Sequence, residues 1–367
     1  MSAPLVADDA PRVASQPLQA LLGRCVATGL LNKSEILSLL ELIDPDEIAA
    51  LFKAADIVRK AEVGDEVHLR GLIEFSNYCR KNCPYCGLRR DNRSLERYRL
   101  KPQEIIDLAM ELDERGFRTT VLQSGEDLSF SADVLAKIVS EIKSKTDLAV
   151  TLSVGERSRD DYALWRQAGA DRYLLRHETV NSRLYDDLQT GSSLSKRLTC
   201  IQNLQSLGYQ VGIGFMAGLP GQSLDDIAAD LEFAQSFQPD MLGIGPFIPS
   251  PETPMGDQPG GTLELALKCV ALARIVTRNS LIPATTAMGS IDEFGREKAL
   301  QAGANVLMPN WTPLGSREKY TIYPNKRCIN EDPKLCQGCL EMRVMGIGRT
   351  ISRSRGDSPK KCELHTI

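Results

Sequence analysis

The sequence predicts an α/β fold, a (β/α)8 TIM barrel with a helical N-terminal extension and a cysteine-containing C-terminal appendage. Three observations support this fold class. Eight short β-rich runs follow one another from residue 72 onward, eight amphipathic stretches alternate with them, and a glycine follows several of these stretches. Alternation of this kind indicates βα units around a parallel sheet, and eight such units are enough to close a barrel.

The elements of the predicted barrel can be placed along the chain. The β-rich runs cover 72–77, 119–124, 148–154, 172–176, 210–216, 241–247, 282–287 and 305–309. The helical patterns lie near 103–115, 131–145, 158–168, 181–188, 195–207, 223–237, 262–278 and 292–302. Helices commonly end in a left-handed glycine, and the glycines in that place are Gly116, Gly169, Gly208 and Gly303. In the barrel we expect function at the C-terminal ends of the strands.

Three domains are expected. Residues 1–70 form a tail and a helical extension, because apolar residues recur at helical spacing over 17–62. Residues 71–309 form the barrel, and residues 310–367, rich in Pro, Gly and Cys, form the appendage.

Composition excludes several classes of protein. The chain has 367 residues, a formal net charge of −4 and no basic tract, so we expect no nucleic-acid partner. It has neither a signal-peptide pattern nor a run of 18 apolar residues, so we expect a cytoplasmic protein without a membrane span. In that compartment its ten cysteines stay reduced, and six of them fall into two tight clusters with metal-ligand spacing.

The first cluster is Cys79, Cys83 and Cys86, which follows directly on the first predicted strand. A 4Fe–4S cubane takes one protein ligand per iron, and this loop supplies three thiolates, which leaves one iron open to other chemistry. Structural zinc is the alternative, but it normally takes four protein ligands, and no second pair lies nearby. The spacing therefore favours a site-differentiated 4Fe–4S cluster.

The C-x3-C-x2-C loop, with the aromatic Tyr85 before its last cysteine, resembles that of the radical S-adenosylmethionine (SAM) superfamily. This resemblance implies that the open iron chelates SAM and that the cluster cleaves SAM reductively to a 5′-deoxyadenosyl radical. It also implies that Tyr85 lies beside the adenine.

Further SAM contacts follow from the same resemblance. Gly125 and Glu126 stand in a motif similar to the family's GGE, with Ser124 in place of the first glycine, and would receive the SAM amino group. Glu178 would lie near the ribose or amine, and Arg197 would pair with the carboxylate through its fork of donors. Met216 belongs to a glycine-rich strand, 212–218, on which the adenine would rest. Each of these residues alone could instead be a helix cap, a rim salt bridge or a barrel bend.

Longer segments resemble the HydE family of maturases, which help to build the active-site cluster of iron-iron hydrogenases. The segments are 83–92, 121–126, 172–179, 243–249, 283–288 and 308–313. Biotin synthase and methylornithine synthase are the main alternatives. Biotin synthase carries cluster-ligating cysteines on its barrel strands, where this chain has Gln123 and Ser153. Methylornithine synthase is the harder alternative to exclude from side-chain chemistry.

The predicted lumen is a cationic, hydroxyl-rich cavity. Its polar strand-end residues are Gln123, Arg176, Thr285, Thr286 and Asn310, with Met288 and Met308 as apolar lining. Ordinary barrel packing is the alternative reading of these residues. The HydE resemblance implies a small organometallic or amino-acid-derived substrate, namely an iron with carbonyl, cyanide and cysteine ligands, attacked at the cysteine sulfur. Arg176 and Thr286 would hold its anionic end. Expected partners are other hydrogenase maturases and a reductant such as ferredoxin or flavodoxin.

The second cysteine cluster is Cys328, Cys336 and Cys339 in the appendage, and it resembles a peripheral iron–sulfur site of HydE-type proteins. A 2Fe–2S or 4Fe–4S cluster is expected there, with zinc as the alternative if Cys362 or water supplies a fourth ligand. A function from another class, a non-catalytic iron–sulfur scaffold or carrier, would have no use for Glu126, Glu178 and Arg197.

Overall fold

The computed structural model describes residues 15–327, 329 and 333–362, with the backbone alone for 333–336 and 361–362. Six parallel strands form a sheet in chain order. They are β2 (Gly71–Ser76), β3 (Thr119–Ser124), β4 (Ala149–Ser153), β5 (Arg172–Leu174), β6 (Gln210–Ala217) and β7 (Met241–Pro246). A second parallel sheet has the order β8-β1-β9, with β8 (Val306–Leu307), β1 (Glu66–Leu69) and β9 (Thr350–Ile351).

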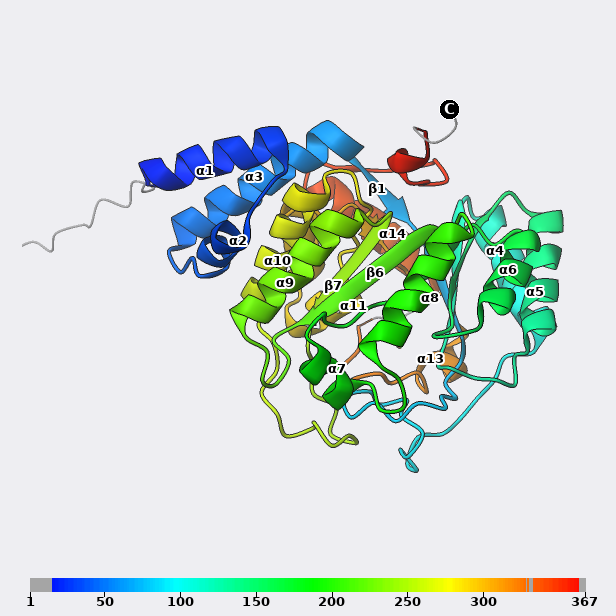
Figure 1. Cartoon of the computed structure of the whole chain (residues 1–367). Coiled ribbons are helices and arrows are strands. Elements are labelled where there is room, and N and C mark those ends of the chain that lie inside the picture. Colours follow the sequence, from blue (N-terminus) through cyan, green and yellow to red (C-terminus); the bar gives the residue numbers. More distant parts are fainter. Residues whose placement is uncertain (1–14, 328, 330–332, 363–367) are drawn as a thin grey trace, which may run out of the picture.

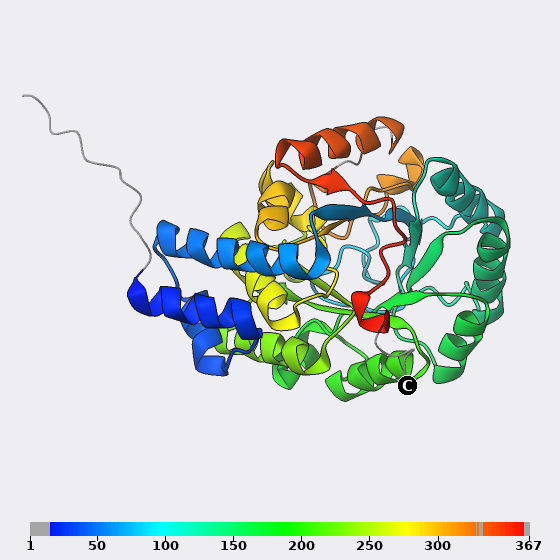
Figure 2. The same ribbon diagram turned by 90° about the horizontal axis from the view of Figure 1, so that it is seen from above.

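Hydrogen bonds join the two sheets into a closed barrel. Leu281 accepts from the backbone N–H of Leu242 at 3.1 Å, and Ala284 donates to Val306 at 2.9 Å. On the other side of the gap, Leu72 donates to Pro309 at 2.9 Å. Segments 281–284 and 306–310 thus occupy the seventh and eighth places of the ring, which Figure 2 shows from above. The predicted (β/α)8 barrel is confirmed.

One predicted strand was wrong in extent. In place of a strand over 282–287, the chain makes two isolated bridges at Leu281 and Pro283, and helix α11 (Thr286–Ile291) begins at Thr286. Pro283 has no N–H to donate to a ladder, which limits regular pairing there. The other seven predicted runs overlap strands of the structure.

Helices surround the barrel (Figure 1). Those between the barrel strands are α4 (Pro102–Glu114), α5 (Ala132–Lys145), α6 (Arg159–Gln167), α7 (Ser182–Leu188), α8 (Leu194–Ser206), α9 (Leu224–Phe237), α10 (Leu263–Thr277), α11 and α12 (Gly295–Gln301). The four glycines predicted to end helices all have positive φ, from 77° to 117°. Of the helices in the described part of the chain, none is long and apolar enough for a membrane span.

The N-terminal helices pack against the outside of the barrel. They are α1 (Gln16–Thr28), α2 (Lys33–Leu40) and α3 (Pro45–Val63), and Figure 1 shows them beside α9 and α10. Arg278, just past α10, donates from Nε to Glu62 at 2.9 Å, and Lys268 donates to the carbonyl of Leu40 at 3.3 Å. The division of the chain at residues 70 and 309 stays a prediction.

The C-terminal segment crosses the N-terminal end of the barrel, over the centre of the ring in Figure 2. After α13 (Leu314–Arg317) and α14 (Pro333–Gly346), the chain forms β9 and then a 3-10 turn, η1 (Pro359–Cys362), where the described residues end. Asp357 accepts from the buried Arg172 at 2.8 Å and from Gln210 at 2.7 Å. These contacts tie residues 352–358, which we name the strap, to the N-terminal ends of β5 and β6.

Candidate active site

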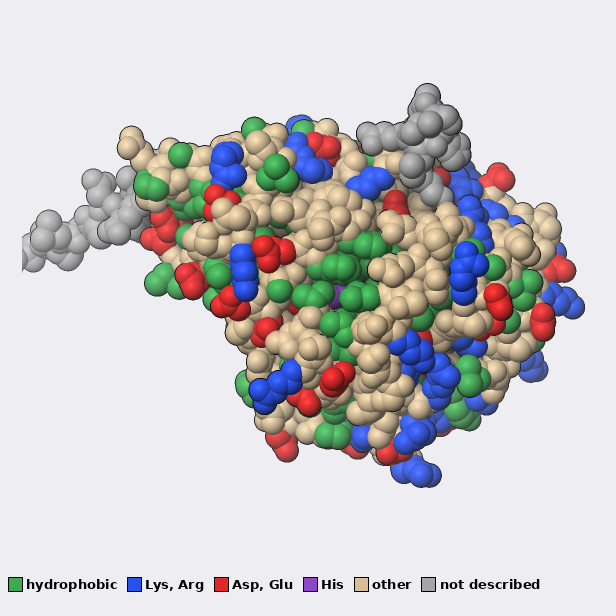
Figure 3. Space-filling model, viewed as in Figure 1, with side chains coloured by type: hydrophobic (Ala, Val, Ile, Leu, Met, Phe, Trp, Pro, Cys, Tyr) green, Lys and Arg blue, Asp and Glu red, His purple; other side chains and the backbone are tan. Residues whose placement is uncertain are grey.

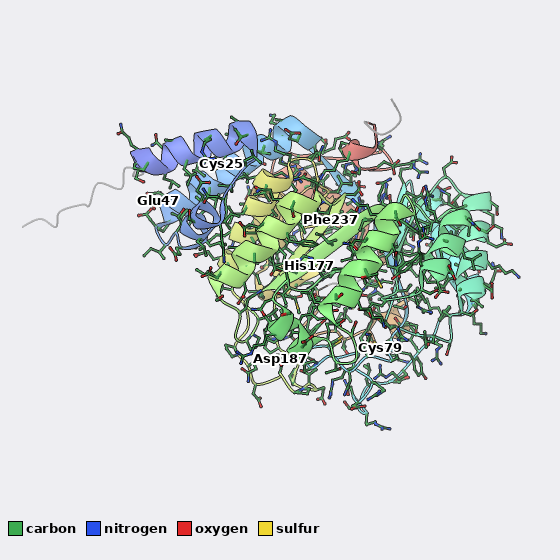
Figure 4. All side chains as sticks on the ribbon, in the orientation of Figure 1. Cys25, Glu47, Cys79, His177, Asp187 and Phe237 are labelled. Carbon is green, nitrogen blue, oxygen red and sulfur yellow. The ribbon has the colours of Figure 1, made fainter. Side chains whose placement is uncertain are left out.

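The cysteine loop leaves the C-terminal end of β2, a strand whose six residues are all buried. Cys79 and Cys86 line a cavity of about 390 Å³ inside this end of the barrel, and Cys83 is buried beside them. Figure 4 shows Cys79 at the end of the barrel opposite α1 and α3. The loop therefore lies where catalytic residues of this fold are found.

One arginine holds the cysteine loop in shape. The guanidinium of Arg97 donates to backbone carbonyls of Asn77, Leu88, Arg89 and Asn92, at 2.6 to 3.2 Å. Burial lowers the pKa of Arg97. A guanidinium has five fixed donors, so it can join several carbonyls of a loop that forms turns but no helix or strand.

The three thiols are partly or fully buried. Burial raises the pKa of Cys86 to about 12, and burial together with the neighbouring thiols Cys86 and Cys79 raises that of Cys83. In the described part of the chain no three His, Cys, Asp or Glu side chains have the arrangement of a single-ion site. A cubane holds its ligands at separate corners, farther apart than the ligands of one ion. Thiolates in such a place need the positive charge of bound iron, which fits a cluster.

Two glycines bring neighbouring chain segments against the loop. A Cβ on Gly125 would lie 2.3 Å from the carbonyl oxygen of Tyr78, and one on Gly87 would lie 2.0 Å from that of Thr321. The N–H of Glu126 points at the sulfur of Cys79, at 3.4 Å. The end of β3 is thus packed on the first cysteine.

The carboxylate of Glu126 has protein partners. It accepts from Nε of Arg80 and from the backbone N–H of Glu156, each at 2.9 Å. Gly125 and Gly155 form the cavity wall at this point. In the predicted motif, Gly125 therefore lines the cavity. Glu126 instead joins the loop after β4 to the cysteine loop.

Glu156 is a buried acid that we did not predict, although it follows the third predicted strand by two residues. It accepts from Arg197 Nε at 2.8 Å, from Ser192 Oγ at 2.7 Å and from Lys81 Nζ at 3.3 Å. Burial would raise the pKa of Glu156, but the charge and hydrogen bond of Arg197, with Ser192 and Lys81, lower it to about 2. The acid is therefore ionised.

Gln189, also not predicted, joins three of the predicted residues. Its amide nitrogen donates to the hydroxyl of Tyr85 at 2.7 Å, and its oxygen accepts from Cys83 and Arg197, both at 3.4 Å. It follows α7 with no sequence signal to mark it. Tyr85 also packs beside the apolar cluster that contains Met216.

The segment after β5 carries Arg176 and Glu178, whose side chains pair at 2.7 Å. Glu178 has a φ of 67°, an uncommon value for a residue with a Cβ. The neighbouring His177, which Figure 4 labels, does not line the cavity. It lies against Asp230 of α9, at 3.3 Å with both side chains fully buried. Asp230 also accepts from the N–H of Val180 at 2.6 Å, so it positions the segment from behind.

The opposite wall of the cavity has a second ion pair. Glu74 of β2 is buried, pairs with Lys326 and accepts from Asn310 at 2.7 Å. The amide of Gln123 approaches the hydroxyl of Tyr320 at 3.4 Å. We predicted Gln123 and Asn310, whereas Glu74, Tyr320 and Lys326 were missed, the last two because they belong to the predicted appendage.

Most of the predicted residues meet at one cavity. Its walls include Cys79, Tyr85, Cys86, Gln123, Gly125, Arg176, Glu178, Arg197, Met216, Thr285, Thr286 and Met308. Asn310 lines a small void beside it, shared with Thr286 and Lys326. Met288, expected as lining, is instead fully buried in the barrel core.

The expectation of a cationic cavity needs correction. Arg176, Arg197 and Lys326 each face a carboxylate, so the lining is close to balanced in charge. Two buried polar atoms of the lining, Thr285 Oγ1 and Arg176 Nε, have no hydrogen-bond partner among the described residues. Such atoms are expected where a ligand supplies the partner.

The second cysteine cluster is only partly described. Cys339 is exposed on α14. Cys336 stands three residues earlier on the same helix, where only the backbone is described, and Cys328 lies outside the described residues.

Comparison with known proteins agrees with this geometry. The radical SAM superfamily matches residues 73–234. An [FeFe] hydrogenase maturase subunit HydE from Thermotoga maritima is 52% identical over 307 residues, which cover 84% of this chain and 88% of the relative. The chain belongs to the HydE family of radical SAM proteins. It is therefore a radical SAM enzyme, and membership implies a 4Fe–4S cluster and SAM as cofactors.

Other relatives are more distant. A 3-methylornithine synthase from Methanosarcina acetivorans is 28% identical over 81% of this chain and 84% of its own. Among solved structures, methylornithine synthase has a TM-score of 0.78 at 24% identity, covering 94% of this chain and 99% of its own. The maturase HydG has 0.77 at 17%, covering 96% and 80%. These two likenesses support the fold alone.

Proposed function

We propose that this enzyme acts in assembly of the active-site cluster of [FeFe] hydrogenase, with its own 4Fe–4S cluster held by Cys79, Cys83 and Cys86. The observation that carries the assignment is the convergence of cysteine loop and predicted SAM contacts on one cavity. When bound, the cluster would supply the electron that cleaves SAM to methionine and a 5′-deoxyadenosyl radical.

The walls of the cavity suggest how SAM is held. Tyr85 and Met216 would contact the adenine, since both line the cavity and Tyr85 packs against the apolar cluster that contains Met216. The backbone at Gly125, with Glu126 behind it, would receive the amino group, and Glu178 would lie near the ribose or amine. Arg197 would take the carboxylate with the part of its guanidinium not engaged by Glu156.

The substrate we propose is a small iron carbonyl cyanide species that carries a cysteine, attacked at its sulfur. Arg176 and Thr286 would hold its anionic end, with Gln123, Thr285 and Asn310 nearby. The unpartnered Thr285 Oγ1 and Arg176 Nε support this placement, because each would gain a partner from a polar ligand. Partners would be other hydrogenase maturases and a reductant such as ferredoxin or flavodoxin. A second iron–sulfur cluster, 2Fe–2S or 4Fe–4S, would be held by Cys328, Cys336 and Cys339.

The test is anaerobic cluster reconstitution, addition of dithionite and SAM, and chromatography for 5′-deoxyadenosine. Each of Cys79→Ala, Cys83→Ala and Cys86→Ala should abolish the product, because loss of one of three thiolates releases the cluster. Cys269→Ala, at a cysteine buried in α10, is the matched control and should retain cleavage. Product formation at the wild-type rate by a loop variant would refute the proposal.

A further inference from the structure

A second pocket lies on the outer side of the cysteine loop, with a volume of about 360 Å³. Its walls are Arg80, Lys81, Asn82, Arg90, Thr190, Gly191 and Lys196. Three of these residues are the ones between Cys79 and Cys83. Because Cys79 lines the inner cavity, one short stretch of chain separates that cavity from the outer pocket.

The outer pocket is cationic at the surface. The side chains of Arg80, Arg90 and Lys196 are 43%, 63% and 56% exposed. Each has an acidic partner, but Glu126 and Glu156, which face Arg80 and Lys196, are buried beneath the surface. The partner of Arg90, Asp91, is itself 45% exposed. Figure 3 shows Lys and Arg side chains gathered on this face, below α8.

The proposed cluster on Cys79, Cys83 and Cys86 would be the acceptor of the electron, so its position limits where a donor protein can bind. Electron transfer weakens steeply with distance, so a donor protein has to come close to the buried thiols. On the cavity side, SAM and substrate would stand in the way under the proposed function. From the outer pocket only the stretch from Arg80 to Asn82 intervenes.

We propose that this pocket is the docking surface for a small acidic one-electron donor protein. The proposal rests on the proposed function, which consumes one electron for each SAM cleaved. At this surface the donor is oxidised by one electron, the enzyme is reduced by one, and no bond forms or breaks. Complementary charge would speed the encounter and fix its orientation.

The test reverses the charge of two of the three exposed cations, as Arg90→Glu/Lys196→Glu, and leaves Arg80, which binds the carboxylate of Glu126, unchanged. Lys196 is in the first turn of α8, after the N-cap Ser193, where a glutamate is favourable for the helix. The matched control is Lys60→Glu/Lys145→Glu, on α3 and at the end of α5, with side chains 69% and 40% exposed. Both double variants change the net charge by the same amount.

The probe is an acidic ferredoxin, and its binding to reconstituted enzyme is measured by calorimetry at low salt. We expect the Arg90/Lys196 variant to bind about tenfold more weakly or worse, and the control pair to bind as the wild type does. The difference should shrink at about 0.5 M salt, because exposed charges are then screened within a few ångströms. Cleavage driven by reduced ferredoxin should need a correspondingly higher ferredoxin concentration.

Other outcomes would overturn the proposal. These are no binding to the wild type, equal binding by both double variants, or displacement of ferredoxin by millimolar inorganic phosphate that itself binds in the pocket. The last result would identify a small-anion site. Dithionite-driven cleavage, which needs no docking, should be unchanged in all variants, so its absence in the wild type would refute the proposed function separately.

Discussion

Arg197 and Glu156 form an ion pair of 2.8 Å in which the side chains are only 6% and 1% exposed. The same guanidinium donates to the carbonyl of Arg176 at 2.5 Å. It thereby joins α8 to the segments after β4 and β5, at the wall of the cavity.

Arg197→Ala should weaken SAM binding about thirty- to a thousand-fold, because it removes a charge-assisted contact worth roughly 2 to 4 kcal/mol. Arg197→Lys should recover only part of the loss, since an ammonium offers a point charge in place of a fork. The measurement is calorimetric titration of SAM into reconstituted enzyme, with iron content checked in parallel. Unchanged affinity in Arg197→Ala would mean that this residue serves only the ion pair.

Glu156 should make stability depend on acid pH. Its pKa of about 2 in the folded protein lies below the ordinary value, so it stabilises the fold above about pH 4.5, and this contribution is lost as the pH falls toward 2. The loss amounts to about 3 kcal/mol. Urea unfolding of the wild type and Glu156→Gln from pH 7 to pH 3 should show a difference that shrinks below pH 4. A difference independent of pH would contradict this assignment.

Gly125→Ala should impair cluster binding, because its Cβ would lie 2.3 Å from the carbonyl oxygen of Tyr78 and 2.8 Å from Cβ of Cys79. The loop would have to shift, and its thiols with it. Iron content after reconstitution and the visible absorption of the cluster report the effect. Gly23→Ala is the control, since nothing lies within 4 Å of its Cβ and alanine favours the helix α1. Full iron loading of Gly125→Ala would show that the loop can yield.

Cys336→Ala and Cys339→Ala should lower the iron content per chain and leave SAM cleavage largely intact. These positions are on α14, and Cys339 is exposed, whereas the residues that line the cavity come from other elements. Iron analysis and chromatography for 5′-deoxyadenosine are measured on the same samples. A folded variant without cleavage would place the second site in the path of the electron.

The barrel and the cysteine loop could be predicted because their signals are local. Strand and helix periods, cap glycines such as Gly116 and the Cys79–Cys86 spacing are read within a few residues of each other. The proposed SAM contacts came from resemblance, and the structure brings Tyr85, Glu178 and Arg197 to the same cavity as Cys79. Their roles stay predictions.

The partners of these residues could not be predicted, because they depend on contacts between distant segments. Glu74 meets Lys326 across 252 positions of sequence, and Gln189 meets Tyr85 across 104. A lone Glu in a strand or Gln after a helix has no pattern that distinguishes it from a surface residue. The location of the cavity could therefore be predicted from the sequence, whereas the pairing of its cations with acids was found only in the structure.

The strap lies over the end of the barrel that is opposite the cysteine loop. Residues 352–358 are tied to one end through Arg172 and Gln210, and side chains fill the interior of a barrel of this kind, so we expect ligands to pass only at the end that carries the cysteine loop. Under the proposed function, whatever enters at the cysteine loop would also leave there, including methionine and the adenosylated product. Products that have not yet left would therefore block the binding of the next SAM, and the rate of product release would set an upper limit on the turnover rate.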